Sequence, residues 1–226
     1  TSADLAADAV LRRGLKALDK DIPILSEEAD IPDFDVRSGW QRYWLLDPLD
    51  GTRGFIRGSN EYTVNIALIE DGRPIIGIIY QPVGNNLFWA CAGQGAFCGA
   101  IDQPAPVNTR TFSQNPAVLS GISLGAGYVS KICAQHNFTL RRVNSSLKLA
   151  YIAKGDADVY LRKGPTCEWD LAAGQCILEE AGGCLVDFAG NVMQYNRKQS
   201  LLNGPFFALG DKTKVDYILQ IIKEDF

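Results

Sequence analysis

Two β-prone segments separated by an Asp-Gly pair constrain the fold of this chain more than any other feature. Residues 62–70 and 73–81 are rich in β-branched and aromatic side chains, and Asp71-Gly72 lies between them. Asp-Gly is strongly favoured in two-residue hairpin turns, because these turns require positive φ values. The pattern therefore predicts an antiparallel hairpin that belongs to a larger sheet.

The first half of the chain carries further element signals around this hairpin. Apolar residues recur at helical spacing between residues 3 and 19, which predicts an amphipathic helix with Asp4 in its first turn. Extended runs are expected at 22–25, 43–46 and 87–92, and we expect the second of these to stop at Asp47-Pro48.

The second half of the chain alternates between the two kinds of element. Strands are expected at 117–122, 158–161 and 184–186, and helices at 146–154, 169–181 and 212–224. Such alternation favours an α/β arrangement. The Gly- and Pro-rich stretch 93–109 is the best candidate for a boundary, which we place near Val107, so two sub-domains are expected at 1–107 and 108–226.

Composition and charge exclude several classes of protein. Of the 226 residues, 46% are hydrophobic, so the chain can bury a substantial core and is not a disordered protein. The net charge is −4, with no basic footprint for a nucleic-acid backbone, and a small anionic ligand would need its own local cations. No apolar run is long enough to span a membrane.

Cysteine usage and the start of the chain bear on location. The six cysteines include no C-x-x-C pair, and His136 is the lone histidine, so a Cys/His zinc site is not expected. We expect reduced cysteines and a cytoplasmic protein, with peripheral membrane association left open. There is no signal-peptide pattern, and because the chain begins at Thr1 rather than Met, an upstream segment is expected.

The densest chemical signal is Asp47-Pro48-Leu49-Asp50-Gly51-Thr52, directly after an apolar strand. Pro restricts its own φ and Gly relieves steric limits, so this turn can aim two carboxylates and a backbone carbonyl at one point. Two carboxylates about 4 Å apart repel by about 4 kcal/mol at an effective dielectric constant of about 20, and a divalent cation reverses the sign. The alternative is a polar turn with an Asp cap.

Two further acidic motifs have both a chemical and a purely structural interpretation. Asp170 precedes a helix that runs to Gly182-Gly183, where it could be a metal ligand or could stabilise the helix N-terminus. Glu27 and Glu28 follow an extended run and could be a ligand pair or two solvated side chains.

Taken together, these motifs resemble a known family in order and spacing. Those that carry the resemblance are Asp4, Ser26-Glu27-Glu28, Asp47-Pro48-Leu49-Asp50-Gly51-Thr52 and Trp169-Asp170-Leu171-Ala172-Ala173-Gly174. They resemble the metal-site motifs of the lithium-sensitive inositol monophosphatase superfamily over nearly the whole chain. The resemblance implies a layered αβαβα sandwich of α+β or α/β class, with a metal site between two sub-domains. It also implies a phosphoric monoester hydrolase.

The resemblance also implies roles for individual residues. Glu27, Asp47 and the carbonyl of Leu49 would hold a first Mg²⁺, and Asp47, Asp50 and Asp170 a second. Thr52 and Asp4 would position and deprotonate the attacking water, with Glu28 behind the ligands. The backbone amides of Gly51 and Thr52 would cradle the phosphate. An all-oxygen ligand set favours Mg²⁺ or Mn²⁺ over Zn²⁺, and the resemblance implies two or three Mg²⁺ ions, for which Mn²⁺ can substitute.

Substrate choice depends on residues outside the metal motifs. Asn144-Ser145-Ser146-Leu147-Lys148 and the Arg162 that follows Tyr160-Leu161 resemble the bacterial 3'(2'),5'-bisphosphate nucleotidases of this superfamily. This implies removal of the 3'-phosphate of 3'-phosphoadenosine 5'-phosphate in sulfur metabolism, with 3'-phosphoadenylyl sulfate as a further substrate. Ser145, Lys148 and Arg162, together with Asp50, Gly51, Thr52 and Asp170, would contact the substrate. Lys148 and Arg162 supply the cations that a second phosphate needs, or are simply solvated side chains.

One segment departs from the family pattern, and two other functions stay open. Residues 120–127 are Gly-rich and carry no basic group, where bacterial nucleotidases have a Ser-Arg-Ser-His type segment. The same metal site would serve an inositol phosphate or sugar bisphosphate phosphatase. A cation-dependent nucleotide-binding module is the non-enzymatic alternative. The expected partner is a small nucleotide bisphosphate, and the expected state is a monomer or weak homodimer.

Overall fold

A sheet that follows the chain order forms most of the first half of the molecule. The structure, a computed structural model, describes residues 1–121 and 127–225, and within them β1–β7 form one sheet in sequential order. β1 is parallel to β2, and each later neighbour is antiparallel. The strands are β1 (Ile24–Ser26), β2 (Arg42–Asp50), β3 (Thr63–Glu70), β4 (Arg73–Gln81), β5 (Asn86–Cys91), β6 (Ala96–Ala100) and β7 (Gln103–Val107). The predicted hairpin is confirmed, with positive φ at both Asp71 and Gly72.

The second sheet is built from strands that are not neighbours in sequence. Its order is β12-β14-β10-β8-β9, with β8 parallel to both β9 and β10 and β14 antiparallel to β10 and β12. The strands are β8 (Ala117–Ser120), β9 (Thr139–Arg142), β10 (Val159–Arg162), β12 (Cys184–Asp187) and β14 (Phe206–Leu209). A short antiparallel pair, β11 (Thr166–Cys167) and β13 (Leu202–Asn203), lies apart from both sheets.

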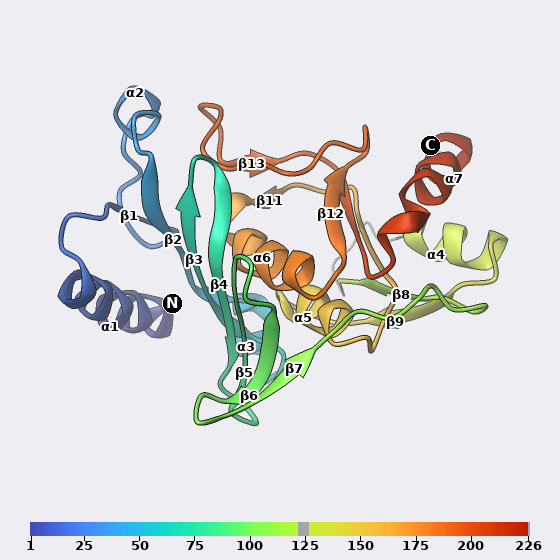
Figure 1. The fold of residues 1–226 in the computed structure, drawn as a ribbon, viewed down its shortest axis with the longest axis horizontal. Helices are drawn as coiled ribbons and strands as arrows, with labels where there is room; N and C mark the ends of the chain where they lie inside the picture. The colour runs from blue at the N-terminus through green and yellow to red at the C-terminus, as the bar shows by residue number, and fades with distance from the viewer. Residues whose placement is uncertain (122–126, 226) are drawn as a thin grey trace.

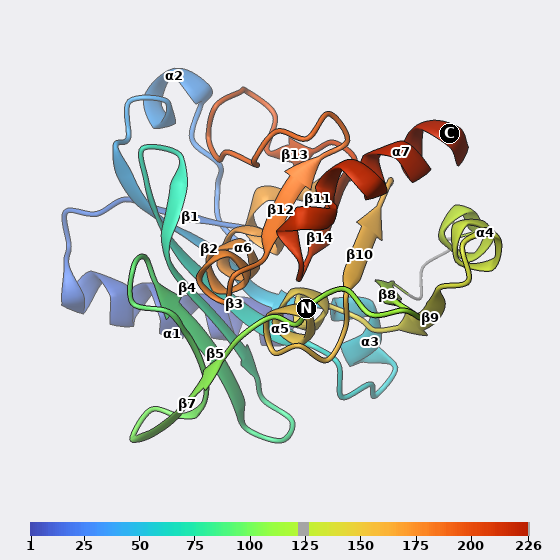
Figure 2. The same ribbon diagram turned by 45° about the vertical axis from the view of Figure 1, so that its right-hand side comes forward.

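Helices separate and cover the two sheets, as Figures 1 and 2 show. The helix α1 (Ser2–Leu18) packs Leu15 against the outer face of the first sheet. Between the sheets lie α5 (Leu147–Ala153) and α6 (Ala172–Glu180), and α4 (Gly127–Gln135) and α7 (Val215–Asp225) cover the far face of the second sheet. This is the expected αβαβα sandwich. Short helical turns complete the elements: α2 (Phe34–Arg37), α3 (Thr52–Ile56), η1 (Glu168–Asp170) and η2 (Lys212–Lys214).

Two glycines let the central helices approach their neighbours closely. A Cβ on Gly77 of β4 would lie 2.3 Å from the carbonyl oxygen of Ala173, and one on Gly174 would lie 2.3 Å from Leu149 Cδ1. Real Cβ atoms do not tolerate such contacts, so α6 packs this closely only because both side chains are absent. The close packing holds the start of α6, and with it Asp170, against the first sheet.

Two sequence expectations are corrected by the structure, and some elements were missed. The strand at 43–46 does not stop at Asp47-Pro48 but continues as β2 to Asp50, with an irregular register between Asp47 and Asp50. The stretch 93–109 contains β6 and β7, which add two strands to the first sheet. The elements α4, β9 and β14 were not predicted at all. Among the described residues, no helix combines the length and apolar character needed to cross a membrane.

The two sheets share one hydrophobic core. Its buried members include Leu45 and Ile79 from the first sheet and Leu119 and Tyr160 from the second, joined through α5 and α6. The change from one sheet to the other falls between β7 and β8, close to the boundary expected near Val107. The division into two sub-domains stays a prediction.

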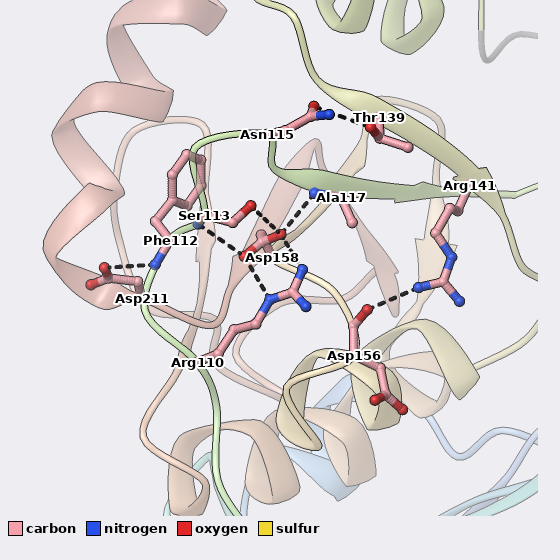
Figure 3. Close-up of polar contacts among 10 residues, drawn as sticks. All are labelled: Arg110, Phe112, Ser113, Asn115, Ala117, Thr139, Arg141, Asp156, Asp158 and Asp211. Carbon is pink, nitrogen blue, oxygen red and sulfur yellow. Dashed lines mark hydrogen bonds and ion pairs between the residues drawn. The ribbon is translucent and has the colours of Figure 1, made fainter.

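A buried carboxylate, that of Asp158, links the segment before β8 to the start of β10 in the second sheet (Figure 3). The side chain of Asp158, which precedes β10, has no exposed surface. It accepts hydrogen bonds from Arg110 Nε at 3.0 Å and Nη2 at 2.5 Å, and from the backbone N–H of Ala117 at 2.7 Å. The N–H of Ser113 approaches the same carboxylate at 3.4 Å. Asp158 therefore ties the segment before β8 to the start of β10.

Candidate active site

The end of β2 presents its acidic residues through a deformed strand. Asp47 is buried, and its Oδ1 accepts a hydrogen bond from the Leu49 N–H at 3.0 Å. The register irregularity after Asp47 turns the backbone, and Gly51 then adopts a φ of 92°, a conformation that disfavours other residues. Asp47 and Asp50 thereby face the same region although two residues separate them.

Asp170 joins these two carboxylates from the second half of the chain. One carboxylate oxygen from each of Asp47, Asp50 and Asp170 lies within 4.8 Å of the other two. Asp170 closes the η1 turn, and its Oδ2 accepts a hydrogen bond from the Cys167 N–H at 2.7 Å. The structure therefore brings together three of the residues that the motifs singled out.

Burial and mutual repulsion dominate the electrostatics of these carboxylates. Desolvation raises the pKa of Asp47 far above its usual value, and the charges of Asp50, Glu27 and Asp170 raise it further. Desolvation, followed by the charge of Asp50, also raises the pKa of Asp170. A group of mutually repelling oxygen ligands, one buried (Asp47) and two half-buried (Asp50 and Asp170), fits a hard divalent cation, whose charge would offset both effects.

Glu27 lies beside this group rather than inside it. It follows β1, which pairs with β2, and its carboxylate lies close enough to Asp47 for the two to influence each other's pKa. Desolvation raises the pKa of Glu27, the proximity of Asp47 opposes this shift, and the negative charge of Asp50 adds to it. Glu28 is half-buried, and its N–H points to Ser26 Oγ at 3.4 Å. Glu27 is therefore a neighbour of Asp47 and is not part of the group formed by Asp47, Asp50 and Asp170.

The predicted pair Asp4 and Thr52 is in contact. Thr52 is the first residue of α3, and its Oγ1 lies 3.0 Å from the Leu49 carbonyl oxygen and 3.3 Å from Asp4 Oδ1. Asp4 is buried on α1, on the side that faces β2. A single hydroxyl proton serves two acceptors here, so Thr52 can donate to either oxygen and accept from a third group.

A cavity of about 160 Å³ opens beside Asp50 and Asp170. The predicted substrate residues Ser145, Lys148 and Arg162 line it, together with Ser146, Tyr160 and Gly121. Ser145 has a φ of 52°, a strained conformation for a residue other than Gly, Asn or Asp. Residues 122–126 of the departing segment lie outside the described residues.

The two cations of the cavity differ in their surroundings. Lys148 is buried: its Nζ donates to the carbonyls of Ser145 and Val143 and lies 5.0 Å from the centre of the Tyr160 ring. Burial lowers the pKa of Lys148 to about 8, although the charge of Asp50 opposes the shift. Arg162 is half-buried and donates to the carbonyls of Gly164 and Pro165, each at 3.2 Å.

The sequence analysis assigned no role to Ser146 or Asn65. Ser146 lies within the stretch quoted for Ser145 and Lys148, but only the structure shows that its Oγ is 2.7 Å from Asp50 Oδ2. Asn65 is a polar residue at an inward-facing position of β3, and this break in the apolar alternation is the signal that could have identified it.

The chain is similar in sequence to proteins of one known family. A family model described as the inositol monophosphatase family matches residues 1–221. The chain is 42% identical over 211 residues to the 3'(2'),5'-bisphosphate nucleotidase CysQ of Salmonella typhimurium, covering 91% of this chain and 83% of that protein. It is 33% identical over 218 residues to CysQ of Haemophilus influenzae, covering 94% and 81%.

Solved structures show the same similarity. The crystal structure of CysQ from Bacteroides thetaiotaomicron superposes with a TM-score of 0.79 at 33% identity, over 89% of this chain and 82% of that one. The inositol monophosphatase from Anabaena gives a TM-score of 0.81 at 26% identity, over 99% and 86%. Because the family model matches residues 1–221 and the CysQ relatives are similar over most of the chain, the chain belongs to the inositol monophosphatase family.

Proposed function

We propose that this protein is a Mg²⁺-dependent 3'(2'),5'-bisphosphate nucleotidase that hydrolyses the 3'-phosphate of 3'-phosphoadenosine 5'-phosphate to AMP and phosphate. The supporting observation is a cavity lined by two carboxylates, Asp50 and Asp170, and by two cations, Lys148 and Arg162. A metal site needs only the carboxylates, whereas a substrate that carries a second phosphate also needs the cations. The CysQ relatives carry the name of this activity.

The carboxylates would hold the metal ions. Asp47, Asp50 and Asp170 would bind one ion, and Glu27, Asp47 and the Leu49 carbonyl another; two or three ions are expected, with Mn²⁺ as a substitute. Bound Mg²⁺ supplies charge neutralisation of the phosphate and activation of water. The all-oxygen donor set supports Mg²⁺ over softer metals.

Residues of the chain would then orient the water and the phosphate. Thr52, whose hydroxyl lies 3.3 Å from Asp4 Oδ1, would align the attacking water and pass its proton toward Asp4. The backbone amides of Gly51 and Thr52 would hold the phosphate oxygens. Arg162 would bind the second phosphate, while Lys148 would contribute its charge and the remaining N–H of its ammonium group.

Phosphate release from 3'-phosphoadenosine 5'-phosphate and inositol 1-phosphate, with and without Mg²⁺, tests this proposal. For Arg162→Glu we expect kcat/KM for the nucleotide to fall at least about tenfold, which corresponds to about 1.4 kcal/mol, with a much smaller change for inositol 1-phosphate. The matched control is Arg141→Glu, because Arg141 donates to the Asp156 carbonyl and does not line the cavity. Equal losses on both substrates would remove Arg162 from substrate selection.

An inositol phosphate or sugar bisphosphate phosphatase is the second candidate. The similarity to the Anabaena inositol monophosphatase over 99% of this chain favours it, and faster turnover of inositol 1-phosphate in the same assay would support it. Binding of the nucleotide without phosphate release at saturating Mg²⁺ would instead indicate a binding module. We propose a cytoplasmic monomer or weak homodimer, a state that sedimentation can measure.

A further inference from the structure

Ser146 occupies a helix-capping position without acting as a cap. It is the N-cap residue of α5, where a serine hydroxyl ordinarily accepts a hydrogen bond from a backbone N–H of the first turn. Its side chain makes no such bond. The hydroxyl lies instead beside two of the proposed metal ligands. Its Oγ is 2.7 Å from Asp50 Oδ2 and 3.0 Å from the backbone carbonyl oxygen of Asp170. The residue therefore contacts two of the segments that carry metal ligands.

Asn65 approaches the same hydroxyl from the first sheet. Its side chain is buried on β3, directly opposite Asp47 on β2, and its Nδ2 donates to Ser146 Oγ at 2.7 Å. Its Oδ1 is buried and has no hydrogen-bond partner among the described residues. Burying a polar group in a strand interior is costly, and this amide has one bond in return. Local folding alone does not explain why an amide stands here.

The directions of the hydrogen bonds at Asn65 and Ser146 determine where the Ser146 hydroxyl proton points. Because Asn65 donates to Ser146 Oγ, the single hydroxyl proton is left to point away from Asn65, toward Asp50 or the Asp170 carbonyl. Asp50 is the nearer acceptor and can carry a charge, which strengthens the bond. An O–H that donates to a carboxylate restricts its rotation, and a metal ligand needs this orientation.

We propose that Asn65 and Ser146 are positioning residues that fix the Asp50 carboxylate for metal binding. This inference rests on the metal site proposed above. In this arrangement the amide orients the hydroxyl, the hydroxyl holds one oxygen of Asp50, and the other oxygen remains available to a cation. Ser146 also keeps the end of β2 at a set distance from the turn that carries Asp170, so the ligands from the two halves of the chain stay together.

The test is a calorimetric titration of Mg²⁺ alone into the full chain after removal of metal by a chelator. For Ser146→Ala we expect the Mg²⁺ dissociation constant to rise about tenfold or more, the usual range for groups that orient a ligand. Asn65→Leu keeps the shape of the side chain and should weaken binding in the same direction. Because the two act in series, the double variant should bind no more weakly than Ser146→Ala alone.

Thermal unfolding without metal separates positioning from a general structural role. Asn65→Leu removes an unpartnered buried oxygen, so its unfolding temperature should stay the same or rise while its Mg²⁺ affinity falls. The matched control is Thr63→Val on the same strand, which deletes a buried hydroxyl that has no hydrogen-bond partner among the described residues, and its affinity should change less than twofold.

The outcomes distinguish failure of this inference from failure of the metal site itself. Wild-type protein that binds Mg²⁺ while Ser146→Ala binds it within twofold would overturn the inference alone. Losses in Asn65→Leu and Ser146→Ala that multiply in the double variant would also overturn it. Wild-type protein that takes up no Mg²⁺ would overturn the proposed metal site as well.

Discussion

Replacing Asp158 by asparagine should destabilise the protein through the cluster shown in Figure 3. The carboxylate receives two hydrogen bonds from Arg110 and one from the backbone N–H of Ala117, and it has no exposed surface. An asparagine keeps one acceptor oxygen but presents an N–H₂ group to donors on the other side. At least one donor therefore loses its partner, and the charge pairing with Arg110 is lost.

The structure sets the size of the effect. Breaking a buried ion pair by removing one partner costs about 3–5 kcal/mol when the remaining charge is stranded. Here the Arg110 side chain is 38% exposed, so water can solvate its charge and the cost is smaller. We expect the free energy of unfolding to fall by about 2–3 kcal/mol, in line with charged hydrogen bonds, and the unfolding temperature to fall by about 4–12 °C.

The pH dependence supplies the assay and its control. Although burial opposes it, the hydrogen bonds from Arg110 lower the pKa of Asp158 below its usual 3.8. A depressed pKa means that the stabilisation is complete above pH of about 4 and is lost as the pH falls through the folded-state pKa. Urea unfolding of wild type and Asp158→Asn should thus show a difference at pH 7 that shrinks toward pH 3. The control Asp156→Asn, at a side chain 44% exposed, should change stability by less than about 0.5 kcal/mol. A difference that stays constant with pH, or equals that of the control, would refute the reasoning.

Two further predictions follow from the site and the packing. Asp47→Asn removes a proposed ligand, so we expect phosphate release below about 10% of wild type, and retained turnover would contradict the ligand assignment. Gly77→Ala would place a Cβ 2.3 Å from the Ala173 carbonyl oxygen, so chemical denaturation should show a loss of about 1–3 kcal/mol or more. Its control, Gly14→Ala on α1, meets nothing within 4 Å and should leave stability equal or raise it by up to about 1 kcal/mol; a harmless Gly77→Ala would show that α6 can move away from β4.

Local patterns were sufficient for part of the fold. The hairpin of β3 and β4 follows from Asp71-Gly72, and α1 follows from the recurrence of apolar residues. The order of the acidic motifs was sufficient for the family and, through it, for the layered sandwich. All of these depend on residues close in sequence or on motifs specific enough to stand alone.

Other elements were invisible to local patterns because their neighbours in space are distant in the chain. The strand β14 is four buried residues, too short a run for periodicity, and it forms only because β10 and β12 flank it. The continuation of β2 through Asp47-Pro48 depends on pairing with β3, which outweighs the turn signal of Pro48.

The candidate site divides in the same way. Residue types and spacing pointed to Asp47 and Asp50 as oxygen ligands, and the resemblance to the family added Asp170 as a ligand and Lys148 and Arg162 as substrate-binding cations. Only tertiary packing placed a carboxylate oxygen of Asp170 within 4.8 Å of those of Asp47 and Asp50. It also brought Ser146 into hydrogen-bonding contact with Asp50, and Asn65 with Ser146. The physical reason is that a carboxylate's chemical nature belongs to the residue, whereas its desolvation, its repulsion from other charges and its hydrogen-bond partners depend on distances that only the folded chain sets.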